Sequence, residues 1–95
     1  MQSNKVVWLR LALEDLHGIG SYLTEHDPEA VQNVVRRIWE TGQSLAQAPS
    51  RGRPGRVPGT REIILVKYPY FLAYRVNKQE VQIIRVLHTS RQYPA

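Results

Sequence analysis

The sequence predicts a small α+β domain with the element order β-α-α-β-β-β, in which an N-terminal strand and a helix hairpin pack on one face of a small, mainly antiparallel sheet. Two segments of the first half repeat apolar residues at helical spacing, and three runs of the second half are rich in β-branched and aromatic residues. The connections between these three runs are short, which is typical of antiparallel neighbours. A chain of 95 residues suits a single domain over residues 1–95.

The first half opens with a short β-rich run at residues 5–9. The helix predicted after it repeats apolar residues every three or four positions, with Glu14 and Asp15 on the other side. Gly18 and Gly20 each cost such a helix about 1 kcal/mol relative to alanine. We interpret them as positions where the second helix approaches closely. The apolar positions are Ala12, Leu13, Leu16, Ile19 and Leu23.

The second helix is predicted to begin at Asp27-Pro28-Glu29. Aspartate suits the N-cap, proline the first helical position and glutamate the first turn. Pro49 ends the pattern. Two helices joined over residues 24–27 are expected to form an antiparallel hairpin. The apolar stripe of this helix consists of Val31, Val34, Val35, Ile38 and Leu45.

Three strands are predicted at residues 61–66, 70–76 and 80–87, after a loop at residues 50–60 that is rich in glycine, proline and arginine. Side chains alternate between the two faces of a strand. On the second run, this alternation places Phe71, Ala73 and Arg75 on one face. On the third run, it predicts one shared face for Val81, Ile83, Arg85 and Leu87.

The net charge of +5 is unevenly distributed along the chain. Residues 1–50 carry a net charge of −2, and residues 51–95 carry +7. Seven of the nine cations in the second half are arginine, which binds phosphate and carboxylate groups through paired hydrogen bonds. We therefore predict a basic surface that meets an acidic partner. The alternative is a solvated basic face without a specific partner.

Several kinds of site are excluded or disfavoured. The chain has no cysteine, which excludes disulfides, thiolate metal sites and cysteine nucleophiles. Its three histidines lack the spacing of metal ligands, and the glycine-rich loop matches no phosphate-binding or dinucleotide motif. No apolar run approaches the roughly 18 residues of a membrane span. We expect a cytoplasmic protein without a metal, a cofactor or a membrane partner.

A group of basic and aromatic residues from the last strands and the tail suits an RNA-cleaving site. Its arginines can hold a phosphate and stabilise developing negative charge, while His88 or Tyr93 exchanges protons. The structural alternative is that His88 ends a strand and bonds a backbone group, while Tyr93 packs its ring against the helices. Arg61 and Arg75 can equally form ion pairs with Glu62, Glu80 or an acidic peptide of another protein. The group consists of Arg61, Arg75, Arg85, His88, Arg91 and Tyr93.

Taken in order, the motifs resemble the RelE/ParE superfamily of toxins from type II toxin–antitoxin modules, over nearly the whole chain. The late motifs are Tyr68-Pro69-Tyr70, Tyr74-Arg75-Val76, Ile84-Arg85-Val86-Leu87-His88 and Arg91-Gln92-Tyr93-Pro94. The early ones are the loop sequence Gly52-Arg53-Pro54-Gly55-Arg56-Val57-Pro58-Gly59-Thr60-Arg61-Glu62 and, in the first helix, Ala12, Asp15, Leu16, Ile19, Tyr22 and Leu23.

The resemblance implies a bacterial toxin that a cognate antitoxin protein neutralises, with operator DNA contacted only through the antitoxin. RelE-like members enter the ribosomal A site and cleave mRNA, whereas ParE-like members inhibit DNA gyrase and block replication. For a RelE-like activity, the resemblance assigns the catalytic site to Arg61, His88, Arg91 and Tyr93. Contact with the antitoxin or the target is predicted for Arg53, Arg56, Arg61, Arg75 and Arg85.

The resemblance favours the ParE-like branch. RelE-like members commonly place lysines where this loop has Arg51, Arg53 and Arg56, and arginine is a poor proton donor or acceptor. The long helix hairpin and the loop motif are also ParE-like. We therefore expect a gyrase inhibitor that is not itself an enzyme. One alternative is a ribosome-dependent mRNA endonuclease, and a second is a non-toxic basic binding module.

Overall fold

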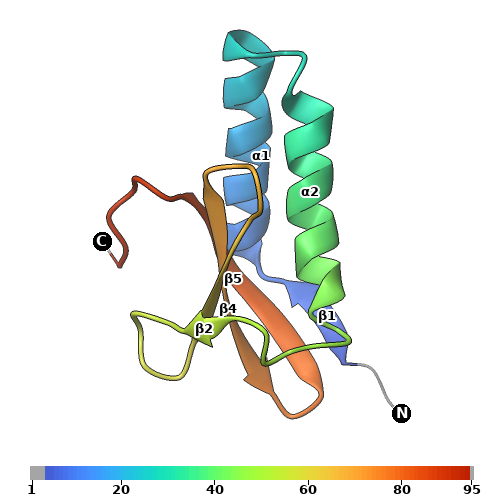
Figure 1. Cartoon of the computed structure of the whole chain (residues 1–95), viewed down its shortest axis with the longest axis vertical. Coiled ribbons are helices and arrows are strands. Elements are labelled where there is room, and N and C mark those ends of the chain that lie inside the picture. Colours follow the sequence, from blue (N-terminus) through green and yellow to red (C-terminus); the bar gives the residue numbers. More distant parts are fainter. Residues whose placement is uncertain (1–3, 95) are drawn as a thin grey trace.

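The computed structural model describes residues 4–94 and confirms the predicted α+β architecture (Figure 1). Strands and helices lie close to their predicted places, and one addition is a two-residue strand inside the arginine-rich loop. No helix within residues 4–94 is long and apolar enough to cross a membrane. The elements are β1 Lys5–Trp8, α1 Arg10–His26, α2 Val31–Ser44, β2 Arg53–Pro54, β3 Arg61–Ile64, β4 Tyr70–Asn77 and β5 Glu80–His88.

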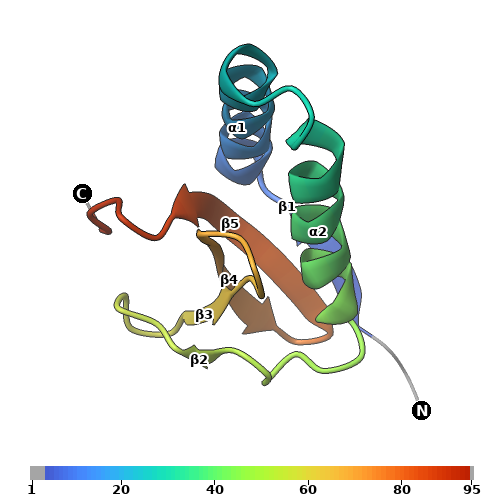
Figure 2. The same cartoon turned by 45° about the horizontal axis from the view of Figure 1, so that its top comes forward.

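The five strands form one sheet in the order β1-β5-β4-β3-β2. β1 runs parallel to β5, and every other pair is antiparallel, because β2 to β5 follow one another through short connections whereas β1 reaches the sheet before both helices. Both helices lie on the same side of the sheet (Figure 2). The opposite side, called the open face below, has no helix over it among the described residues.

The core divides into two clusters because strand side chains alternate between the faces. The helix-side cluster joins Leu72 and Tyr74 of β4 to Ala12 and Ile38 of the helices, all of them buried. The open-face cluster is smaller and contains Phe71, Ala73 and Leu87, with Tyr93 packed against it. The helix hairpin is therefore held by one face of β4 and β5, while the other face keeps a small apolar centre of its own.

β5 contains a bulge that breaks the predicted alternation. Ala73 of β4 pairs with Arg85, but Tyr74 pairs with Ile83, so that one extra residue lies in β5. The prediction that Val81, Ile83, Arg85 and Leu87 share a face is therefore wrong beyond Ile83. Val86 joins the helix-side cluster with Val81 and Ile83, whereas Leu87 packs on the open face.

The second helix begins later than predicted. Its first residue is Val31, with Ala30 as N-cap, rather than Asp27-Pro28. The Asp27 carbonyl accepts a bond from the Ala30 N–H at 2.9 Å, so Pro28 takes the second position of a turn, which its fixed φ also suits. The Asp27 N–H donates to the Leu23 carbonyl at 2.7 Å and closes α1. The turn reverses the chain between the helices, as the predicted hairpin requires.

The close approach predicted at Gly18 and Gly20 is also wrong. A Cβ built at either position meets no other atom within 4 Å. Within the helices, close packing occurs at Gly42 of α2, where a Cβ would overlap the indole ring of Trp8. That ring stacks on Trp39 with centroids 4.9 Å apart. β1 and α2 thus meet through an aromatic ring lying over a glycine.

Candidate functional site

The open face carries a buried carboxylate surrounded by arginines. Glu62, which is 1% exposed, lies 3.4 Å from Arg53 Nη2 and 3.2 Å from Arg56 Nε. It also accepts a bond from the Arg56 N–H at 2.9 Å. The Arg56 guanidinium lies 4.9 Å from the ring centroid of Phe71 and 5.9 Å from that of Tyr93. We call these five residues the Arg56 cluster.

Glu62 can accept both arginines because β3 directs it to the open face beside β2. In the sheet, Arg53 stands opposite Glu62, and Glu62 stands opposite Ala73, whose small side chain leaves space above the strand. Two guanidinium groups share one carboxylate, so the cluster keeps a net positive charge. Arginine over aromatic rings is stabilised further by the negative faces of those rings.

Arg61 lies apart from this cluster because neighbouring strand residues point to opposite faces. Its Nη1 donates to the carbonyls of Gly52 and Ser50 at 2.8 and 3.3 Å. Across the sheet it stands opposite Tyr74, whose hydroxyl donates to the Pro49 carbonyl and accepts the Gly52 N–H, both at 2.8 Å. Together these bonds hold the loop that precedes β2 against β3 and β4.

Arg75 and Arg85 each have an intramolecular partner. Arg75 Nε donates to the Gln82 side-chain oxygen at 2.5 Å, and Gln82 in turn donates to Glu80 at 2.7 Å. Arg85 donates from Nε and Nη2 to Asp15 at 2.7 and 3.0 Å. The bonds to Asp15 raise the pKa of the Arg85 guanidinium above its usual value.

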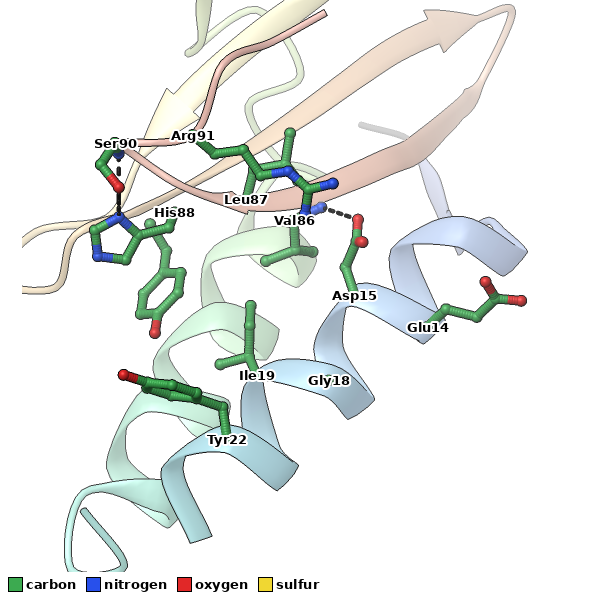
Figure 3. A pocket seen from close by; sticks show the side chains of 11 residues that line it. Glu14, Asp15, Gly18, Ile19, Tyr22, Val86, Leu87, His88, Ser90 and Arg91 are labelled. Carbon is green, nitrogen blue, oxygen red and sulfur yellow. Dashed lines mark hydrogen bonds between the residues drawn. The ribbon is translucent and has the colours of Figure 1, made fainter. Parts of the chain in front are cut away.

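A pocket of about 550 Å³ lies between α1, the end of β5 and the tail (Figure 3). Asp15 forms part of one wall and also accepts the Val86 N–H at 3.0 Å, which ties α1 to β5 just after the bulge. No group of three or more histidines or carboxylates within residues 4–94 is arranged to hold a metal ion. The pocket is lined by Glu14, Asp15, Gly18, Ile19, Tyr22, Tyr70, Val86, Leu87, His88, Ser90 and Arg91.

His88 is fixed at the aromatic end of the pocket. Its Nδ1 accepts the Ser90 N–H at 3.1 Å and lies 2.7 Å from the Ser90 hydroxyl, so the neutral ring carries its proton on Nε2. The ring meets Tyr70 edge to face, with centroids 5.3 Å apart. Burial raises the pKa of the Tyr70 phenol above its usual 10.0, and Tyr22 contributes to the rise.

Tyr22 forms the rim of the same pocket. It is 58% exposed and stacks on His26, one helical turn later, with centroids 4.1 Å apart. In Figure 3, Tyr22 and His88 lie at one end of the pocket, and Arg91 extends toward the end where Asp15 lies.

The structure brings some of the predicted site residues together and separates others. His88 and Arg91 share the pocket, whereas Tyr93 belongs to the Arg56 cluster and Arg61 holds the loop. No site role was predicted for the pocket residues Asp15, Tyr22, Tyr70 and Ser90, or for Glu62. A usable signal was present on α1, where Gly18, Tyr22 and His26 follow one another at intervals of four residues and therefore share one face.

The chain is similar to known proteins that are described as toxins. The model of a family described as the ParE toxin of the type II toxin–antitoxin system parDE matches residues 6–93. The chain is 39% identical over 94 residues to Y4kP of Sinorhizobium fredii, whose name proposes a toxin, covering 99% of this chain and 97% of that protein. It is 37% identical over 87 residues to toxin RelE2 of Caulobacter vibrioides, covering 92% of this chain and 97% of that protein.

A solved structure from a chromosomal ParDE toxin–antitoxin system of P. aeruginosa has a similar fold. It superposes with a TM-score of 0.83 at 31% sequence identity and covers 90% of this chain and 96% of its own. The similarity thus extends over both layers of the fold, including the helix hairpin and the sheet.

Proposed function

Because this chain belongs to the ParE family of toxins from type II toxin–antitoxin systems, we propose that it blocks replication by inhibiting DNA gyrase and that a cognate antitoxin neutralises it. In this proposal the chain acts in the cytoplasm as one domain, and it acts by binding rather than by catalysis. Operator DNA is contacted only through the antitoxin. The likeness to a chain of a ParDE system supports the ParE-like reading.

The observation that carries the proposal is the separation of His88 from Tyr93. A ribonuclease needs its proton-transfer groups within hydrogen-bond reach of one phosphate. Here the His88 ring packs on Tyr70, a residue of the helix-side cluster, whereas Tyr93 packs on Phe71 on the open face. Arg61, one of the arginines expected to hold a phosphate, is bound to backbone carbonyls. This arrangement favours a surface that binds over one that cleaves RNA.

The contact surface in this proposal is the open face. The five arginines predicted for contact and their two carboxylate partners, Glu62 and Asp15, carry a net charge of +3. Arg61, which points away from the open face, and Arg75 have no ionic partner in this group. Arg53, at the edge strand β2, keeps 56% of its side chain exposed although it pairs with Glu62. A rigid basic surface of this kind steers acidic partners toward the protein and orients them.

Two parallel reactions test the proposal. The first contains purified toxin, gyrase, ATP and plasmid and is read for loss of supercoiling and for linear DNA. The second contains toxin and a translating ribosome extract and is read for cleaved mRNA. We expect linear plasmid and intact mRNA. Cleaved mRNA with normal supercoiling would overturn the proposal, and two unaffected reactions would favour the non-toxic binding module.

A ribosome-dependent mRNA endonuclease is the second candidate, because His88 and Arg91 share one pocket and one relative is named RelE2. In that case, replacement of the proton donor lowers the rate of mRNA cleavage by about 10²- to 10⁴-fold. His88→Ala and Tyr93→Phe distinguish the candidates. The second change keeps the ring that packs on Phe71. Under the gyrase proposal we expect both folded variants to cause the same loss of supercoiling as the wild-type protein.

A further inference from the structure

Gly18 shapes the pocket between α1 and the tail without serving the packing of the toxin itself. A glycine inside a helix costs about 1 kcal/mol relative to alanine. At Gly18 a Cβ would meet no atom within 4 Å, so no close contact among the described residues requires its absence. Because Gly18 has no side chain, the part of the pocket wall between Asp15 and Tyr22 consists of helix backbone and leaves the space above it open (Figure 3). The pocket therefore has room that the folded chain does not fill.

The aromatic end of the pocket presents a large exposed ring beside a buried one. Tyr22 is 58% exposed, whereas Tyr70 is 8% exposed. Ile19 and Val86 add aliphatic surface between them. Exposed tyrosines that stand beside a concave apolar surface are typical of the residues that dominate protein–protein binding energy. This end suits an aromatic or aliphatic side chain of a partner.

The charged end of the pocket offers donors to an anion. Both oxygens of Asp15 already accept bonds from Arg85. Glu14 lies 3.6 Å from Arg10 in an exposed pair. The Arg91 side chain, in contrast, makes no ion pair within residues 4–94. An incoming carboxylate therefore finds a guanidinium whose donors are open.

We propose that this pocket is an anchor site for the cognate antitoxin. An aromatic or leucine side chain of the antitoxin lies over Gly18 and against Tyr22, and an aspartate or glutamate of the same segment pairs with Arg91. The occupant is a peptide rather than a nucleic acid, because Arg91 is the one arginine or lysine among the residues that line the pocket and much of the remaining lining is apolar or aromatic, whereas nucleic acids bind through several phosphate contacts at once. The inference rests on the proposed function only for the existence of an antitoxin.

Calorimetric titration of the toxin with the purified product of the neighbouring reading frame tests the site. Gly18→Met fills the pocket from a helical position that has open space. Gly20→Met is the matched control, because Gly20 has equal space on the same helix but lines the groove between the helices. We expect Gly18→Met to raise the Kd at least about tenfold and Gly20→Met to raise it less than about twofold. Gly18→Ala supplies a smaller change if Gly18→Met does not fold.

Arg91→Gln tests the charged end separately. We expect a Kd about three- to tenfold higher than that of the wild type and a weaker dependence of binding on salt. Wild-type affinity in both Gly18→Met and Arg91→Gln would overturn the proposal, as would the absence of binding to the wild-type toxin. A single-stranded RNA oligonucleotide that binds the wild type but not Gly18→Met would assign the pocket to nucleic acid instead. The gyrase reactions contain no antitoxin and the titration contains no gyrase, so failure of either proposal is seen separately.

Discussion

Glu62 is the side chain on which the open face depends most. It buries a negative charge that two arginines and one backbone N–H satisfy together. Glu62→Gln keeps the size of the side chain but removes the charge that holds Arg53 and Arg56 close to each other. We expect a loss of about 2–4 kcal/mol in the free energy of unfolding, measured by urea denaturation. Arg53→Gln, at a half-exposed position, is expected to cost less than about 1 kcal/mol.

Equal losses in the two variants would contradict this account, because they would mean that the buried carboxylate contributes no more than its exposed partner. The comparison is informative since both changes remove one charge from the same ion pair. Only Glu62→Gln also leaves two guanidinium groups without a shared anion.

Tyr70 makes the free energy of unfolding depend on pH in the alkaline range. Burial raises the pKa of its phenol above 10.0, with a further contribution from Tyr22. The folded state therefore holds this proton more tightly than the unfolded state. The resulting stability is present below about pH 10 and is lost as the pH rises through the folded pKa. We expect the free energy of unfolding to fall more steeply above pH 10 in the wild type than in Tyr70→Phe. Parallel slopes in the two proteins would contradict the assignment.

At the scale of elements, the joint between β1 and α2 depends on Gly42. The Trp8 ring lies over this glycine, stacks on Trp39 and donates its Nε1–H to Gln43 at 2.9 Å. Gly42→Ala inserts a methyl group into that contact, and we expect a loss of about 1–3 kcal/mol in the free energy of unfolding. Gly20→Ala is the control, because it meets open space and is expected to gain up to about 1 kcal/mol. If both changes stabilise the protein, the Trp8 ring moves aside for the methyl group without a loss in the free energy of unfolding, and the prediction is wrong.

The elements themselves could be predicted because each depends on a local pattern. The helical spacing of Ala12, Leu16 and Leu23 and the β-rich run from Tyr70 describe nearest neighbours along the chain. The start of α2 was mistaken because Asp27-Pro28 suits a turn as well as a helix start. Only the need to reverse the chain between two packed helices decides between the two, and that need is a tertiary one.

The arrangement of the candidate site could be predicted only in part. Residues near the end of β5 were expected to lie close together, and His88 and Arg91 do share a pocket. The bulge before Val86 changes which face each later residue takes, and the tail then carries Tyr93 to the open face. Alternation along one strand contains no information about an extra residue opposite Ala73. The catalytic roles that the resemblance assigned to these residues stay predictions.

For the whole molecule, the uneven distribution of charge along the sequence becomes a difference in net charge between the helix layer and the sheet. Residues 1–50, with a net charge of −2, supply both helices and β1. Residues 51–95, with +7, supply the other four strands and the tail. We therefore expect an acidic antitoxin to be drawn toward the sheet, and the pocket beside α1 to supply the apolar anchor proposed above. Long-range charge acts mainly on the rate of association, and buried anchors act mainly on dissociation.

The contribution of each layer's charge to the association rate can be measured by removing one paired arginine from each layer. Arg53→Gln on β2 and Arg10→Gln on α1 both delete an arginine that pairs with a glutamate. We expect Arg53→Gln to lower the rate constant for association with the antitoxin about two- to fivefold at low salt, and to weaken its salt dependence, because this charge belongs to the basic layer. Arg10→Gln is expected to change the rate much less. Stopped-flow mixing at low and physiological salt gives both rates. Equal effects would mean that net charge, rather than its position on the sheet, governs the encounter.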